Sequence, residues 1–147
     1  VTNEIRESLA AKIVVFQSPA SFKETEENIT NMREFFRGIE QDRKDITMVW
    51  EQRGKWDRKT IEKLCDELEL IHGVDPFAED PVTAGFAYFR LHGSPPGKRM
   101  YRYTYTDDDL KRLYEKCLNT GSSEVYVLFN NDTMYDDALR FMKMVNG

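Results

Sequence analysis

"FAYFRLHGSPPGKRMYRYTYT", residues 86–106, decides the fold of this chain. It begins as an apolar strand whose last polar residues are Arg90 and His92. It then turns through Gly93 and two prolines into a loop that carries cations and tyrosines and leads to a helix. A strand, a loop and a helix form the unit of parallel α/β folds, in which ligands bind beyond the carboxyl ends of the strands. The stretch therefore predicts both a fold class and a place for a site.

The same alternation of strand and helix patterns extends along the chain. Apolar runs predict five strands, at residues 12–19, 46–53, 70–78, 85–93 and 124–131. Apolar residues at three- and four-residue spacing predict four helices, at residues 24–40, 57–70, 106–121 and 135–145. Strands that are apolar on both sides and alternate with helices are typical of parallel βα units. The predicted fold class is therefore α/β, in a single domain over residues 1–147.

Three residues predict helix ends. Asp57 is placed to cap the second helix, and Thr106 stands three residues before Asp109 in a relative of the capping box. Gly121 is placed to end the helix that Thr106 begins.

The composition limits the classes of protein to consider. The chain has 147 residues, a net charge of -5 and a 40% hydrophobic share, which suits a globular domain with no overall attraction to nucleic acid or acidic membranes. No apolar run approaches the roughly 20 residues of a membrane-spanning helix, and no signal peptide opens the chain. Cys65 and Cys117 lie in helical patterns without CxxC spacing, which predicts reduced thiols and a cytoplasmic location. The first residue is Val1 and not Met, as expected for part of a longer chain.

Polar side chains end every predicted strand, in the order Gln17 and Ser18, Glu51 and Arg53, Asp75, Arg90 and His92, and Asn130 and Asn131. Alternate residues of a strand point to the same side, which places Glu51 with Arg53, and Arg90 with His92. If both sides face one interior, two guanidinium groups, a carboxylate and an imidazole converge. The pattern predicts a binding site at the carboxyl ends of the strands.

Each of these residues also has a structural interpretation, and these alternatives stay open. Glu51 and Arg53 could form a buried ion pair without a ligand. His92 could be a hydrogen-bonded core histidine, and Asp75 could be a turn residue before Pro76. Asn130 and Asn131 could bond the following turn.

The loop after the fourth strand predicts an anion-binding lid. Lys98, Arg99 and Arg102 supply cations, while Tyr101, Tyr103 and Tyr105 share a parity and would flank one face of an extended segment. Arginine and tyrosine together offer charge-assisted hydrogen bonds to phosphate or carboxylate and flat surfaces for a base or sugar. A solvated surface turn is the alternative, and the support for nucleic acid is weak because the domain is acidic overall.

Metal and cofactor chemistry has little support in the sequence, so no cofactor is predicted. The chain has two histidines and no HExxH motif, glycine-rich phosphate loop or GxSxG elbow. A single divalent ion between Glu51, Asp75 and His92 stays open.

Six short motifs together resemble the YecE-like family, known as domain of unknown function 72. They are VVFQSPASF (14–22), WEQRGKW (50–56), VDPF (74–77), YFRLHG (88–93), RYTY (102–105) and VYVLFNN (125–131). The resemblance implies a TIM-type (β/α) barrel of which this chain forms the last five strands, with the first three before Val1. Two features depart from the family pattern: Tyr114 stands where a tryptophan is usual, and the loop after Asn131 is short.

The function expected from these residues is binding, and possible hydrolysis, of a phosphate-bearing or other anionic substrate. Arg53, Arg90 and Arg102 would hold the anion, and Glu51 or His92 would act as general acid or base. The other expected substrate-binding residues are Gln17, Trp56, Asp75, Tyr103, Asn130 and Asn131. A non-catalytic nucleotide or nucleic-acid binder and a structural or assembly domain are the alternatives. A partial barrel would also expose strand edges, which predicts self-association or pairing with a missing segment.

Overall fold

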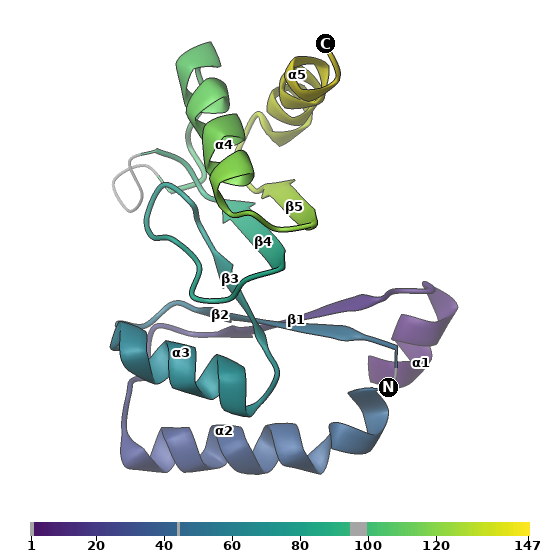
Figure 1. Ribbon diagram of the computed structural model, residues 1–147, viewed down its shortest axis with the longest axis vertical. Helices are drawn as coiled ribbons and strands as arrows, with labels where there is room; N and C mark the ends of the chain where they lie inside the picture. The colour runs from purple at the N-terminus through teal and green to yellow at the C-terminus, as the bar shows by residue number, and fades with distance from the viewer. Residues whose placement is uncertain (1, 44, 95–99) are drawn as a thin grey trace. The chain divides into compact units, whose positions relative to one another are not determined.

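The computed structural model describes residues 2–43, 45–94 and 100–147, in which strands alternate with helices (Figure 1). The elements are α1 (Thr2–Ser8), β1 (Ile13–Ser18), α2 (Glu26–Gly38), η1 (Glu40–Arg43), β2 (Thr47–Gln52), α3 (Arg58–Glu67), β3 (Ile71–Val74), β4 (Phe86–Leu91), α4 (Asp107–Asn119), β5 (Glu124–Phe129) and α5 (Met134–Asn146). The chain forms two compact units, Val1–His72 (unit 1) and Gly73–Gly147 (unit 2). A single domain over residues 1–147 stays a prediction.

The five strands pair in parallel, in the order β1-β2-β3-β4-β5. In unit 1, β1 and β2 pair along their whole length, from Ile13 opposite Thr47 to Ser18 opposite Gln52. In unit 2, β4 and β5 do the same, and Val74 of β3 lies opposite Phe89. These pairings confirm an α/β fold with five parallel strands alternating with helices. Within each unit, the carboxyl ends of paired strands therefore lie at one edge.

The predicted strands and the four predicted helices are all present, and the differences have local causes. β3 ends at Val74 and is therefore shorter than the predicted strand at residues 70–78. The chain turns there because the Asp75 carboxylate accepts a hydrogen bond from the Phe77 N–H, 3.0 Å away. The short helix α1 had no predicted counterpart. Its apolar side chain Ile5 is exposed, so no buried face marked it in the sequence.

The predicted helix caps are confirmed. The Asp57 side chain accepts from the Lys59 N–H at 3.0 Å at the start of α3. Thr106 and Asp109 form a capping box at the start of α4. Gly121 takes a positive φ of 62° directly after the C-cap of α4, a conformation that glycine adopts without strain.

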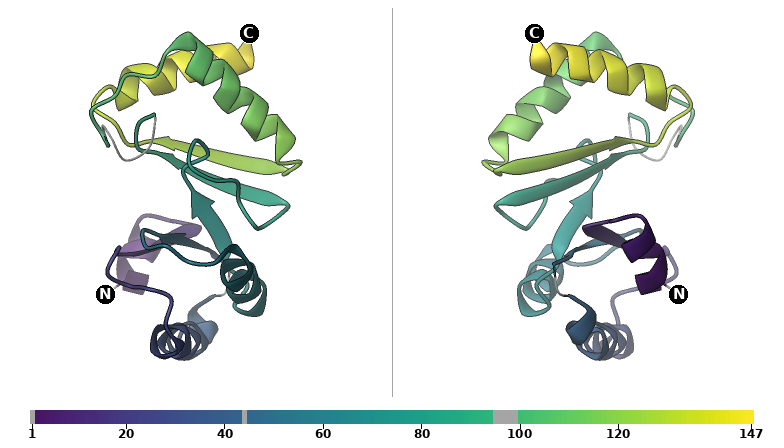
Figure 2. Two further views of the ribbon diagram at one scale, coloured as in Figure 1. Left: turned by 90° about the vertical axis from the view of Figure 1, so that its left-hand side faces the viewer. Right: turned by 90° about the vertical axis from the view of Figure 1, so that its right-hand side faces the viewer.

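Each unit has its own core, with two helices on one side of its paired strands (Figure 2). In unit 1, α2 and α3 bury apolar side chains together with the centre of β2, which contributes Val49 and Trp50. In unit 2, α4 and α5 cover β4 and β5, and the core residues are Val74, Ala87, Phe89, Leu91, Tyr105, Leu110, Leu113 and Phe141.

His72 is a fully buried polar residue of unit 1 and lies at the end of the ladder between β2 and β3. Its Nε2 lies 2.9 Å from Oε1 of Gln52. Burial, with a smaller contribution from the charge of Arg58, lowers the pKa of His72 to about 4. The imidazole is therefore neutral at neutral pH and contributes to the core without a buried charge.

We expect His72 to make the stability of the chain depend on pH. Because its pKa falls from 6.5 to about 4 on folding, the unfolded chain binds more protons between those values, and stability falls as the pH falls through that window. The loss is about 2 kcal/mol between about pH 8 and about pH 5. Urea denaturation of the chain and of the His72→Gln variant at both pH values measures it. The same pH dependence in both proteins would contradict the assignment.

Candidate functional site

The carboxyl ends of β1 and β2 bring three predicted site residues together in unit 1. Nε of Arg53 lies 2.9 Å from Oε1 of Glu51, and Nη2 of Arg53 donates to Oε1 of Gln17 at 3.4 Å. The Glu51 side chain is 5% exposed and that of Arg53 is 20% exposed. The pair is therefore largely removed from water, and one guanidinium links the ends of two neighbouring strands.

Trp56 lies in an aromatic cluster that supports the same strand ends. Its indole N–H donates to the carbonyl of Phe22 at 3.0 Å, and its ring stacks on Phe22 at a centroid distance of 5.8 Å. The ring also meets Trp50 edge-on, and the indole N–H of Trp50 donates to Oγ of Ser18 at 3.1 Å. Gly54 permits this approach, because a Cβ there would lie 2.9 Å from the Phe22 carbonyl oxygen. The contacts fasten the segment after β1 to the segment after β2.

The carboxyl ends of β3 and β4 bring Asp75 and His92 together in unit 2. Oδ2 of Asp75 accepts from the backbone N–H of His92 at 3.0 Å and lies 3.5 Å from its Nδ1. The His92 and Asp75 side chains are 6% and 9% exposed. The carboxylate therefore fixes the position of the histidine and, through the Phe77 N–H, the turn that follows β3.

Tyr101 joins the ends of β4 and β5. Its N–H donates to the carbonyl of His92 at 2.6 Å, and its carbonyl accepts from the N–H of Asp132 at 2.7 Å. Its φ is +69°, a left-handed conformation that costs energy for a residue with a Cβ. The two backbone hydrogen bonds hold Tyr101 in this conformation, and such strain is often found at functional sites. The exposed side chain of Arg102 follows directly.

Asn131 continues this network at the end of β5. Its Nδ2 donates to the carbonyl of Tyr103 at 2.7 Å and to Oδ2 of Asp137 at 2.7 Å. Asp137 is fully buried and also accepts from the N–H of Tyr105 and from Thr133, while Nη1 of Arg140 donates to its other oxygen at 3.0 Å. One buried carboxylate thus fixes the segment after β4 against the start of α5.

Asp109 holds Tyr103, in the segment between β4 and α4. Its carboxylate accepts from the hydroxyl of Tyr103 at 2.7 Å and pairs with Arg112. Burial acts to raise the pKa of Asp109, but hydrogen bonds from Tyr103, Thr106 and Arg112 outweigh it and hold the pKa below its usual value. The hydrogen bond to Asp109 raises the pKa of the Tyr103 phenol. The capping carboxylate of α4 is therefore ionised and also positions Tyr103.

The expectation that three tyrosines flank one face of an extended loop is wrong. Tyr101 is 41% exposed, whereas Tyr105 is fully buried in the core of unit 2. The hydroxyl of Tyr105 accepts from the N–H of Gly93 at 2.8 Å, and burial raises its pKa. The positive φ of Tyr101 breaks the alternation that the prediction assumed. Lys98 and Arg99 lie outside the described residues.

The remaining predicted site residues also lie near strand ends. Arg90 is half-buried in β4, and the backbone N–H of Asn130 donates to the carbonyl of Leu91 at 2.9 Å. We use the name β4–β5 rim for Asp75, Arg90, His92, Tyr101, Arg102, Tyr103 and Asn131. Glu51 and Arg53 belong to unit 1, so binding of one ligand by both groups stays a prediction.

Asp137, the buried centre of the network below the β4–β5 rim, was not among the predicted site residues. Its sequence signal is an acidic residue four positions before Phe141, on the apolar face of a predicted helix. An acidic residue in the first turn of a helix is also a common surface feature, so the spacing alone did not identify a buried group.

Within the described part of the chain, no group of three or more histidine, cysteine, aspartate or glutamate residues could hold a metal ion. Cys65 and Cys117 are unpaired, and burial raises their pKa values to about 12 and about 11. None of the described helices is long and apolar enough to cross a membrane.

Comparison with known proteins identifies a family. The model of a family described as "Protein of unknown function DUF72" matches residues 5–147, which confirms the resemblance carried by the six motifs. No curated protein and no solved structure matches the chain.

We expect Asp75 to be a structural requirement of the β4–β5 rim. Replacing it with alanine leaves the partly buried N–H groups of Phe77 and His92 without their acceptor, which costs about 2–4 kcal/mol of stability. Asp75→Asn keeps one acceptor oxygen and should cost less. Urea denaturation gives the values, with the exposed Asp136→Ala, expected to cost less than about 1 kcal/mol, as the control. Equal losses for Asp75→Ala and Asp136→Ala would contradict this role.

Proposed function

The chain belongs to the family of unknown function DUF72, and we propose that it binds small anionic ligands, phosphate-bearing ones in particular, at the carboxyl ends of its parallel strands. The family description names no substrate, so the proposal rests on the side chains at those ends.

The charge environment of Arg102 is the observation that carries the proposal. Other guanidinium groups of the chain have carboxylate partners: Arg33 and Arg37 pair with Glu67, Arg53 with Glu51, Arg112 with Asp109, and Arg140 with Asp107 and Asp137. No carboxylate of the described residues pairs with Arg102. Its backbone is nevertheless held between Tyr101 and Tyr103, which bond to the ends of β4 and β5. An exposed guanidinium on a fixed stretch of backbone, without a carboxylate partner among the described residues, suits a phosphate or carboxylate ligand.

The other rim residues have proposed roles around that anion. Arg90 supplies a second guanidinium from β4, and the rings of Tyr101 and Tyr103 form flat walls for a base or sugar. Asn130 and Asn131 orient a leaving oxygen or a water molecule. His92, held by Asp75, acts as general acid or base if the ligand is hydrolysed.

In unit 1, the ends of β1 and β2 carry a second group of polar side chains with proposed roles. Arg53 binds anionic oxygens, Glu51 acts as the alternative acid or base, and Gln17 and Trp56 complete the contacts. The burial of Glu51 beside Arg53 supports this role, because removal from water strengthens electrostatic interactions with a ligand.

We propose that the fold is the carboxyl-terminal part of a TIM-type (β/α) barrel. Parallel strands that pair in chain order, with each of the four connections leading to the neighbouring strand, support this architecture. The unpaired thiols of Cys65 and Cys117 support a reducing compartment such as the cytoplasm.

A non-catalytic nucleotide or nucleic-acid binder is the second candidate function. The exposed Arg102 beside Tyr101 favours it, because cations and aromatic rings bind nucleotides without catalysis. A steep loss of affinity for an oligonucleotide with added salt would support several phosphate contacts.

Removal of the Arg102 charge should weaken phosphate binding. The Arg102→Gln and Arg90→Gln variants each lose a charge-assisted interaction, and the dissociation constant for inorganic phosphate should rise about 10- to 100-fold. Isothermal titration calorimetry measures it, with Arg37→Gln, whose side chain is 64% exposed and pairs with Glu67, as the matched control. Phosphate affinity that is the same in all four proteins would contradict the proposal.

An enzyme and a binder should respond differently to changes at Glu51 and His92. If the chain is a hydrolase, Glu51→Gln or His92→Gln should lower turnover of p-nitrophenyl phosphate by about 100-fold or more while phosphate affinity changes little. If it only binds, no turnover above that of the buffer will be found in the parent chain. Circular dichroism melting curves verify that both variants are folded.

A further inference from the structure

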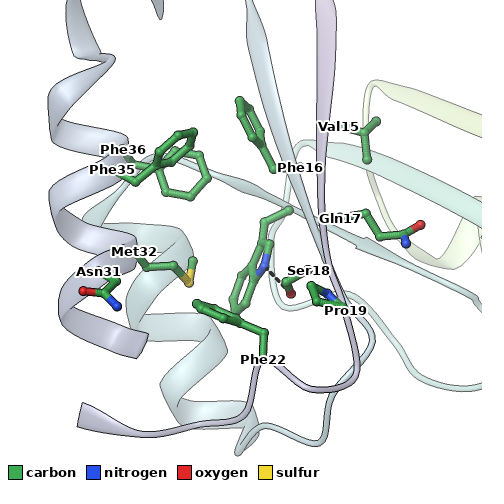
Figure 3. Close-up of a pocket in the computed structure, with 11 residues that line it drawn as sticks. Val15, Phe16, Gln17, Ser18, Pro19, Phe22, Asn31, Met32, Phe35 and Phe36 are labelled. Atoms are coloured by element: carbon green, nitrogen blue, oxygen red, sulfur yellow. Dashed lines mark hydrogen bonds between the residues drawn. The ribbon is translucent and has the colours of Figure 1, made fainter. Parts of the chain in front are cut away.

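The apolar pocket between β1 and α2 is explained by the proposed fold (Figure 3). It has a volume of about 530 Å³, and Phe16 of β1 lines it together with Phe35 and Phe36 of α2. A closed barrel has no open strand edge, so in the proposed barrel a preceding strand would pair with β1 along this side of the pocket. Elements of the same fold then cover the space, and we assign it no ligand.

The strained conformation of Tyr101, in contrast, is not explained by the fold alone. Among the described residues, the non-glycine residues with a positive φ are Ala10, Asp45, Glu69 and Tyr101. Ala10 and Glu69 lie two residues after the ends of α1 and α3, where a left-handed residue commonly ends a helix. Aspartate tolerates this conformation better than most residues. Tyr101 is bulky and lies between β4 and α4, so its conformation has another cause.

The backbone around His92 is fixed by three hydrogen bonds. The Asp75 carboxylate accepts from the N–H of His92 at 3.0 Å. The carbonyl of His92 accepts from the N–H of Tyr101 at 2.6 Å. The N–H of the next residue, Gly93, donates to the hydroxyl of Tyr105 at 2.8 Å. The position of the imidazole is therefore set, and the hydrogen bond from Tyr101 joins it to the strained residue.

The ring of Tyr101 meets the imidazole of His92 edge-on. The two ring centroids are 5.8 Å apart, and the planes make an angle of 76°. His92 is 5% exposed, whereas Tyr101 is 41% exposed, so the tyrosine ring lies between one side of the imidazole and the solvent. The sign of φ sets the direction of Cβ relative to the backbone, and a negative φ would direct this ring elsewhere.

We propose that Tyr101 is a positioning residue, held in its left-handed conformation so that its ring shields the imidazole of His92 from bulk water. This rests on the proposed function, in which His92 is the general acid or base. Exclusion of water strengthens the interactions of such a group with the charges of a ligand. The same fixed backbone carries Arg102, so one segment sets the anion-binding guanidinium relative to the acid or base.

Chemical labelling of His92 tests the shield. Diethyl pyrocarbonate modifies accessible neutral imidazoles, and mass spectrometry of peptides distinguishes the two histidines of the chain. Tyr101→Asn removes the ring but keeps a residue that tolerates a positive φ, so His92 should be modified at least about 10-fold faster than in the parent chain. Tyr101→Phe keeps the ring, and its rate should stay within about twofold of the parent rate.

Controls separate loss of the shield from loss of the fold. His72, which is fully buried in unit 1, should be modified equally slowly in the parent chain and the variants. Hydrogen exchange of the backbone amides of β4, which lies between β3 and β5, should also be unchanged and reports opening of unit 2. Tyr135→Asn, at an exposed tyrosine of α5, is the matched control and should leave the His92 rate unchanged.

Three outcomes would overturn the proposal. The first is an equal rate of His92 modification in the parent chain and in Tyr101→Asn. The second is a Tyr101→Phe rate as high as that of Tyr101→Asn, because loss of the hydroxyl alone would then explain the change. The third is a faster His92 reaction that faster exchange in β4 accompanies, because the ring would then stabilise unit 2 as a whole. The labelling needs no ligand, so its failure is distinct from a failure of Arg102 to bind phosphate.

Discussion

Parallel pairing of the strands is the constraint on which the candidate site depends. Parallel neighbours require a crossover between them, so helices return the chain to the start of the sheet and the carboxyl ends of paired strands meet at one edge. In unit 1 this pairing places Ser18 opposite Gln52, immediately before Arg53, which links Gln17 and Glu51. The polar groups are therefore brought together by backbone geometry and not by mutual attraction alone.

In unit 2, buried carboxylates also hold the segments after the strands in place. Asp75, Asp109 and Asp137 each accept hydrogen bonds from backbone groups or side chains of the segments that follow β3 and β4. Polar side chains are costly to bury without hydrogen-bond partners, and these three have donors around them. The strained Tyr101 and the exposed Arg102 thus lie on a segment that is fixed on both sides.

Features that depend on a few neighbouring residues were predictable from the sequence, and features that depend on distant contacts were not. The strands and the capping box of Thr106 and Asp109 were predictable, because hydrophobic period and cap chemistry are written within a few residues. The pairing of Glu51 with Arg53 followed from strand parity. The burial of Tyr105 and the role of Asp137 were not predictable, because they depend on contacts between residues 32 positions apart. The positive φ of Tyr101 likewise arises from its bonds to two strand ends.

The buried thiol of Cys65 can be used to measure local unfolding of unit 1. Burial raises the pKa of Cys65 to about 12, so the side chain is a thiol at neutral pH, and its burial also limits access by reagents. Alkylating agents and mild oxidants therefore reach this sulfur only when the core of unit 1 opens. The rate at which Cys65 is modified therefore measures how often the core of unit 1 opens, without an added label.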